Sequence, residues 1–161
     1  MRTQPFLRMY PSEDDGIPAD CLKGSFDPSH VADVERRVNE APIMVHCGMR
    51  ARIDLNGKVT AGLPAIEPYH LGGLEGEVIN GGVLLGLVDC TLVGSAMVHF
   101  AGARCGTIDI SVNMMRPVIG AGFEVTGYVV SKTKLLAFSR SVVTDRRGRI
   151  CAMGSGVVAK L

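Results

Sequence analysis

Residues 79–102 have the sequence INGGVLLGLVDCTLVGSAMVHFAG, and this stretch decides the fold. Asn80 is a credible N-cap, because its side chain can accept a hydrogen bond from a free amide of the next turn. Residues 83 to about 100 are apolar on nearly every side, which predicts one buried helix closed by Gly102. Its length would also suit a membrane span. Asp89 in its middle, the internal glycines and the lack of basic flanks argue against one.

The sequence on both sides of this helix predicts antiparallel strands. Residues 45–55 alternate between apolar and polar, and Asn56-Gly57 predicts a two-residue hairpin turn before a second strand at 58–66. Four more strands are expected after the helix, at residues 107–118, 123–130, 135–144 and 149–159. A single buried helix needs a sheet that curls around it, because nothing else could cover its faces. The predicted fold class is therefore α+β, with a curved antiparallel sheet wrapped around one long central helix.

The strand predicted at 107–118 alternates along its length. Isoleucines, a valine and a methionine (Ile108, Ile110, Val112, Met114) are expected on one face, and Thr107, Asp109, Ser111 and Asn113 on the other. We expect the methionines at 97, 114, 115 and 153 to be core residues.

The first 42 residues form a region of different character. Residues 1–27 are rich in Pro, Asp and Gly and predict an arm, while Asp27-Pro28 predicts the start of a short amphipathic helix that ends near Glu40. The predicted organisation is an N-terminal arm and short helix at 1–42, followed by the main domain at 43–161.

Composition and charge narrow the classes of function. The 161 residues carry a formal net charge of +1, which argues against a general nucleic-acid binder. The charge is uneven, with 8 Lys and Arg against 13 Asp and Glu in residues 1–100, and 9 against 3 in residues 101–161. This asymmetry could serve self-association or the capture of a phosphate-bearing ligand, or it could be chance. Five scattered cysteines without a CxxC pair predict reduced thiols, and no apolar leader is visible, so the expected location is the cytoplasm.

Asp89 is the first candidate functional residue. A carboxylate inside an apolar helix is costly to bury unless it is paired or functional. Gly82, Gly86, Asp89 and Val93 fall on one helical stripe, so the carboxylate lies on a face cleared of side chains. A structural interpretation, in which neighbouring backbone amides satisfy a buried Asp, stays open beside the functional one.

The start of the helix is the second candidate. Free amides at Asn80-Gly81-Gly82 carry the positive end of the helix dipole and could polarise a carbonyl, although many helices begin this way for structural reasons. Together with Asp89 they suggest acyl transfer to water. Cys90 is expected in the core. The basic turn at 146–149 is most simply solvated, and the histidines lack metal-ligand spacing, so no metal or cofactor is expected.

Three segments resemble PaaI-like hotdog-fold acyl-CoA thioesterases: residues 79–89, residues 107–120, which include an Arg-Pro pair, and residues 143–152. The resemblance covers roughly residue 45 to the C-terminus. It implies a hotdog fold, an acyl-CoA substrate and a homodimer or dimer of dimers with the site at the subunit interface.

The resemblance also implies roles for individual residues. Asp89 matches the family's catalytic acid, which acts as nucleophile or general base, and Gly81 matches the glycine whose amide polarises the thioester carbonyl. Thr107 falls where the family places a hydroxyl that positions water. Asp89 and Gly81 would come from different chains. Further expected substrate contacts are Gly82, with Arg116, Lys132 and Lys134 near the CoA phosphates.

Two positions depart from the family pattern. Asn80 replaces the usual His, and Leu74 stands where many members have Asn or Gln. Glu77 could substitute as a polar group in the site, or it could be solvated. The leading hypothesis is thioester hydrolysis by Asp89. The rival, which both departures favour, is a catalytically silent hotdog protein that binds acyl-CoA as a sensor or scaffold.

Overall fold

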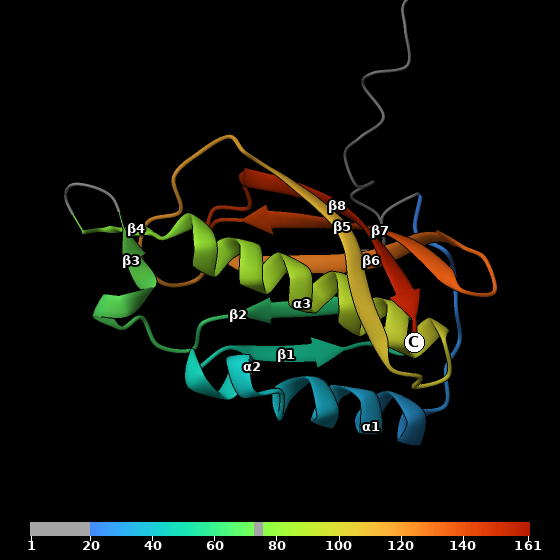
Figure 1. Cartoon of the computed structure of the whole chain (residues 1–161). Coiled ribbons are helices and arrows are strands. Elements are labelled where there is room, and N and C mark those ends of the chain that lie inside the picture. Colours follow the sequence, from blue (N-terminus) through green and yellow to red (C-terminus); the bar gives the residue numbers. More distant parts are fainter. Residues whose placement is uncertain (1–19, 73–75) are drawn as a thin grey trace, which may run out of the picture.

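The computed structural model describes residues 20–72 and 76–161, and it confirms the α+β architecture (Figure 1). One long helix, α3 (Gly81–His99), lies against a six-stranded antiparallel sheet of order β1-β2-β6-β7-β8-β5. The sheet strands are β1 (Arg50–Ile53), β2 (Val59–Gly62), β5 (Cys105–Met114), β6 (Glu124–Lys132), β7 (Leu136–Thr144) and β8 (Ile150–Lys160). The smaller elements are α1 (Pro28–Asn39), α2 (Pro42–His46), η1 (Pro68–His70), β3 (Leu71–Gly72) and β4 (Val78–Ile79).

Both ends of α3 form as expected. The Asn80 side chain accepts a hydrogen bond of 2.8 Å from the Gly82 amide, so Asn80 is the N-cap. At the other end Gly102, with φ of 75°, donates its amide to the Met97 carbonyl at 2.8 Å. This bond closes the last turn and lets the chain reverse into β5.

The predicted burial of α3 on all sides is wrong along one stripe. Leu84, Leu87, Val88 and Leu92 are buried in the core. By contrast, Gly82 and Leu85 are exposed, and Gly86, Asp89, Cys90 and Val93 are only partly covered. The sheet and α1 pack against α3, and this stripe is left partly exposed among the described residues.

Glycines in the sheet let α3 lie close to it. A Cβ atom on Gly127 would stand 2.5 Å from the Cβ of Thr91, and one on Gly154 would stand 2.7 Å from Cγ1 of Val88. Both distances are far below van der Waals contact, so these positions require glycine. The hydroxyls of Thr91 and Ser141 lie 3.1 Å apart and satisfy each other in this tight interface.

The strand predicted at 45–55 is shorter than expected. Pro42 occupies the first turn of α2, which takes up residues 42–46, and Gly48 turns the chain with φ of 60° before β1 begins at Arg50. Proline at a helix start competes with the strand pattern, because its fixed φ favours the first helical turn. Ala51 and Ile53 are buried, as the alternation predicts.

The hairpin between β1 and β2 exists, but the predicted two-residue turn is wrong. Strand pairing ends at Ile53 and Val59, and the Asp54 side chain accepts hydrogen bonds from the amides of Asn56 and Lys58 at 2.9 and 3.0 Å. A tight turn would need positive φ at both Asn56 and Gly57, whereas only Gly57 has it, at 84°. The Asp54 side chain thus organises a longer loop.

Helix α1 packs along the outer edge of β1. Asn39 accepts a hydrogen bond from the Ala51 amide and donates one to the Ala51 carbonyl, both at 2.9 Å. Glu35 accepts a bond of 2.7 Å from the Ile53 amide. The backbone groups at this edge of the sheet are therefore satisfied by side chains of α1.

Candidate active site

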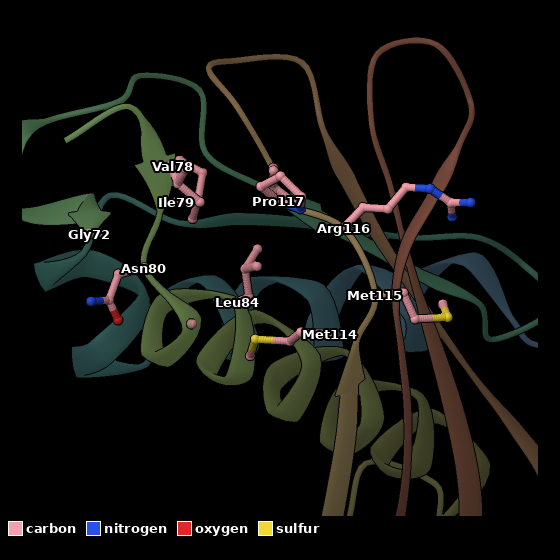
Figure 2. A pocket seen from close by; sticks show the side chains of 11 residues that line it. Gly72, Val78, Ile79, Asn80, Leu84, Met114, Met115, Arg116 and Pro117 are labelled. Atoms are coloured by element: carbon pink, nitrogen blue, oxygen red, sulfur yellow. The ribbon is translucent and has the colours of Figure 1, made fainter. Parts of the chain in front are cut away.

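A pocket of about 370 Å³ opens beside the start of α3 (Figure 2). We call it the α3 pocket. It is bounded by β3 and β4, by the first turn of α3 and by the end of β5 with the chain that follows. Its lining residues are Gly72, Val78, Ile79, Asn80, Gly81, Leu84, Met114, Met115, Arg116, Pro117 and Val118.

The first turn of α3 offers a free amide to this pocket. The Gly82 amide is taken by the Asn80 side chain, but no acceptor is found for the Gly81 amide among the described residues. A Cβ at Gly81 would stand 3.2 Å from the sulfur of Met114, which reaches from β5 across the helix start (Figure 2). An unpaired amide at the positive end of a helix can donate to a carbonyl oxygen or an oxyanion.

His70 supports this turn, a role that no pattern in the sequence indicates. Its ring is buried, its Nδ1 accepts a bond of 2.9 Å from the Glu67 amide, and its Nε2 donates to the Cys47 carbonyl at 2.8 Å. Its own carbonyl accepts the Asn80 amide at 2.8 Å. His70 is therefore structural, and it ties η1 and the end of α2 to the N-cap of α3.

Asp89 lies on the uncovered stripe of α3 and contacts β5. The Thr107 hydroxyl donates a hydrogen bond of 2.5 Å to its Oδ1. Asp89 is partly buried, and no ion pair of its carboxylate is found in the part of the chain that the structure describes. The other carboxylate oxygen is therefore available to a ligand.

A β-bulge in β5 brings Thr107 to Asp89. The pairing with β8 shifts between Thr107 and Asp109, so Ile108 is the extra residue. The predicted alternation is therefore wrong at this point: Thr107 faces α3 together with Ile110, while Ile108 is 62% exposed. Without the bulge, the period of two would turn Thr107 to the opposite face of the sheet.

The structure does not bring Asp89 and Gly81 together within one chain. Eight residues of helix separate them, which corresponds to about 12 Å along the axis. Asp89 is also absent from the lining of the α3 pocket. Within one chain, the two groups therefore do not line a common pocket among the described residues.

Cys90, beside Asp89, does not compete for the chemistry. Burial, reinforced by the Asp89 charge, raises the pKa of its thiol to about 11. The thiol therefore stays protonated near neutral pH. Cys90 is only partly covered on α3, although it packs against the core as expected.

The other predicted substrate contacts are dispersed. Arg116 lines the α3 pocket and donates to the Ile150 carbonyl at 2.6 Å. Glu77 and Gly82 are exposed near the start of α3, outside the pocket lining. Lys132 lies at the far end of α3, where its ammonium donates to the His99 carbonyl at 2.7 Å, and Lys134 is exposed in the following turn.

Some site positions were missed or cannot be placed. Met114 and Met115 were expected in the core, yet they are 50% and 49% exposed and line the α3 pocket, because β5 is an edge strand. The pair Arg116-Pro117, which follows β5 and also lines the pocket, was the sequence signal that could have located this side of it. Leu74 and Glu75 lie outside the described residues. Among residues 20–72 and 76–161, no group of three or more His, Cys, Asp or Glu side chains could hold a metal ion.

Comparison with known proteins places this geometry in a structural class. No family model and no curated protein sequence matches the chain. Solved structures do match the chain. A thioesterase family protein from Silicibacter pomeroyi superposes with a TM-score of 0.70 at 21% identity, covering 82% of this chain and 98% of its own. The chain has the hotdog fold of the thioesterases.

Two further hotdog structures give the same result. The E. coli PaaI protein from the phenylacetic acid degradation operon superposes with a TM-score of 0.70 at 13% identity, over 83% of this chain and 94% of its own. Zebrafish thioesterase superfamily member 2 gives 0.68 at 20% identity, over 85% and 100%. These neighbours confirm the predicted fold.

The packing of α3 bears on whether this apolar helix could instead span a membrane. In the described part of the chain, α3 alone is long and apolar enough to cross a bilayer, and 56% of its most apolar window is buried inside the domain. The buried side of α3 packs on the six-stranded sheet, as the core helix of a domain does.

Proposed function

We propose that this hotdog protein hydrolyses acyl-CoA thioesters, with Asp89 as the catalytic carboxylate. The observation that carries the proposal is the Asp89–Thr107 pair, which presents a carboxylate on the uncovered stripe of a helix otherwise packed in the core. A carboxylate without a cationic partner on such a face suits a nucleophile or a general base.

The chemistry divides between two parts of the site. The Gly81 amide donates a hydrogen bond to the thioester carbonyl oxygen and stabilises the negative charge that develops there. Asp89 either attacks the carbonyl carbon, forming an anhydride that water then opens, or removes a proton from an attacking water. Either way the carbon–sulfur bond breaks, the sulfur leaves as the CoA thiol after gaining a proton, and the acyl group leaves as a carboxylic acid. Thr107 is a positioning residue, since its hydroxyl fixes the orientation of the carboxylate.

We further propose that each site combines Asp89 of one chain with Gly81 of another. The uncovered stripe of α3 lies next to β5, the open edge of the sheet, so a second copy pairing there would cover both. A dimer, alone or doubled into a dimer of dimers, fits this arrangement. The five cysteines are all free thiols, which supports the cytoplasm as the location.

A silent acyl-CoA-binding protein is the second candidate. It is favoured by Asn80, whose side-chain oxygen is committed to the Gly82 amide in place of the family's usual imidazole. In that case the same pocket would bind the ligand without turning it over.

The decisive measurement is CoA release from a panel of acyl-CoAs by the wild type, Asp89→Asn and Asp89→Ala. We expect either substitution to lower kcat at least about 1,000-fold with little change in KM, because the reacting group is lost while binding stays. Equal release from wild type and both variants, together with CoA binding, would establish the silent protein instead.

Mixing two inactive variants tests the shared site. Gly81→Val places a side chain against Met114 and blocks the amide, while Asp89→Ala removes the carboxylate. After the two proteins are unfolded together and refolded, half of the dimers are mixed, and each mixed dimer contains one intact site. About a quarter of wild-type activity should return. If both groups act within one chain, no activity returns.

A further inference from the structure

The turn between β7 and β8 holds a group of arginines that the proposed chemistry does not use. Residues 145–149 are Asp-Arg-Arg-Gly-Arg. Arg149 forms an ion pair of 2.8 Å with Asp145, and hydrogen bonds from the Arg149 backbone amide, then from its side chain and the Arg147 amide, lower the pKa of the Asp145 carboxyl. Arg146 and Arg147 are exposed, and neither guanidinium has an ion pair within the described ranges.

These side chains line a second pocket of about 200 Å³, which we call the turn pocket. Its lining residues are Pro117, Ile119, Asp145, Arg146, Arg147 and Arg149. Pro117 also lines the α3 pocket, so the two pockets meet at this residue. Arg116 extends away from Asn80 and Leu84 beside Pro117 (Figure 2) and donates to the Ile150 carbonyl, which follows the turn.

The charge around the turn pocket is strongly positive. Arg116, Arg146, Arg147 and Arg149 face a single acid, Asp145, and that acid is already paired. Guanidinium groups bind phosphate through paired N–H donors, and they keep their charge at any physiological pH. A concave, unpaired arginine surface that adjoins a pocket for an acyl group suits a ligand with an acyl group at one end and phosphates at the other.

We propose that the turn pocket, through Arg146 and Arg147, binds the phosphates of the 3′-phospho-ADP end of a CoA thioester whose carbonyl lies at Gly81. This assignment rests on the proposed function. It moves the phosphate contacts to one end of the sheet, away from Lys132, whose ammonium is held by the His99 carbonyl and lies 5.3 Å from the centre of the Phe100 ring. Under this proposal, part of the excess positive charge of residues 101–161 serves to bind phosphate.

The test is the double variant Arg146→Ser/Arg147→Ser. Both side chains are exposed in a turn held by backbone bonds to Asp145, so the fold is unaffected. Lys23→Ser is the matched control, since it also removes exposed positive charge, and its neighbour Leu22 bonds to Val129 near the opposite end of β6. The binding probe is adenosine 3′,5′-bisphosphate, titrated calorimetrically with inorganic phosphate alongside.

We expect the double variant to bind this nucleotide about tenfold more weakly and its KM for an acyl-CoA to rise about as much. Its KM for the same acyl group on pantetheine, which lacks the nucleotide, should stay unchanged, as should all values for Lys23→Ser. Unchanged nucleotide affinity in the double variant would overturn the assignment. So would equal wild-type affinity for phosphate and nucleotide, which indicates a simple anion site. If no thioester is hydrolysed, the proposed function fails, while the nucleotide titration still decides the role of the arginines.

Discussion

The two edge strands of the sheet, β1 and β5, differ in whether another part of the chain bonds to their outer side. At the β1 edge, Asn39 and Glu35 of α1 bond to the backbone of Ala51 and Ile53, so no row of free amides and carbonyls is left there. At the β5 edge, ten residues have β8 on one side and no described strand on the other. Ile108, Met114 and Met115 are exposed at or just beyond that edge.

The difference indicates where a partner belongs. An open, apolar strand edge is a template for pairing with another chain, and natural proteins cover such edges unless they use them. This protein covers β1 with its own helix and leaves β5 open beside the Asp89 stripe. The covered edge at β1 therefore belongs to the single chain, whereas the open edge at β5 is where we propose that a second copy pairs.

Among the changes that test this comparison of the two edges, Ile108→Lys at the open edge is expected to have the largest effect. Ile108 is exposed in the single chain, so the fold should survive, but a charge there opposes pairing of two β5 strands. We expect a monomer by analytical ultracentrifugation and a loss of thioesterase activity of at least about 100-fold, because no site is complete. Leu55→Lys, at an exposed apolar residue of the β1–β2 turn, is the control and should stay oligomeric. An active, oligomeric Ile108→Lys protein would contradict the role of this edge.

The second effect is acid sensitivity at the closed edge. His99 packs on Phe26 with ring centres 4.9 Å apart, and its Nε2 is buried without a hydrogen bond. Burial, with a contribution from Lys132, lowers the pKa of His99 from 6.5 to about 4. The unfolded chain therefore binds a proton at a higher pH than the folded one, so stability is lost as pH falls from 6.5 through 4.

The size of this loss is about 3 kcal/mol at pH values below 4, at 1.36 kcal/mol for each unit of pKa shift. Urea unfolding at a series of pH values measures it. His99→Leu should lose less stability than the wild type between pH 7 and pH 4, because one titrating group is gone. Parallel curves for the two proteins would show that His99 does not titrate in this way.

A smaller effect is expected from Asn39→Ala, which opens the β1 edge. The substitution removes both hydrogen bonds to Ala51 and leaves that backbone unpaired, at a cost of about 2 kcal/mol in the free energy of unfolding. Denaturant unfolding gives the loss, and light scattering tests for new self-association through β1. Arg36→Ala on the exposed face of α1 is the comparison and should leave the unfolding curve nearly unchanged, because solvent screens its ion pairs. If the Asn39→Ala protein unfolds at the same denaturant concentration as the wild type, these two hydrogen bonds do not stabilise the β1 edge.

The smallest effect is expected at Thr107, which the β-bulge at Ile108 turns toward Asp89. Thr107→Val keeps the shape but removes the hydroxyl bonded to Asp89, so kcat should fall about tenfold with KM unchanged. Thr107→Ser should restore kcat, because it brings the hydroxyl back. A Thr107→Val protein whose stability falls while kcat stays at the wild-type value would make Thr107 merely structural.

Sequence alone supplied the parts that depend on near neighbours. The N-cap at Asn80, the apolar run of α3 and the reversal at Gly102 involve residues within a few positions of one another, so their signals survive without a structure. Asp89 stood out for the same reason, as one acid in an apolar helix. The successive strands after α3 followed from alternation and turn residues. The family resemblance added Gly81 and Thr107 to the candidate site.

Only the tertiary structure decided how these parts meet. The bulge at Ile108, the glycines beneath α3 and the support of Asn80 by His70 depend on contacts between residues far apart in sequence. Periodicity carries no information about such contacts. The exposure of Met114 likewise follows from the place of β5 at the end of the strand order. A strand's pattern is set by its own residues, but its neighbours are set by long-range pairing, and the neighbours determine which edge is open.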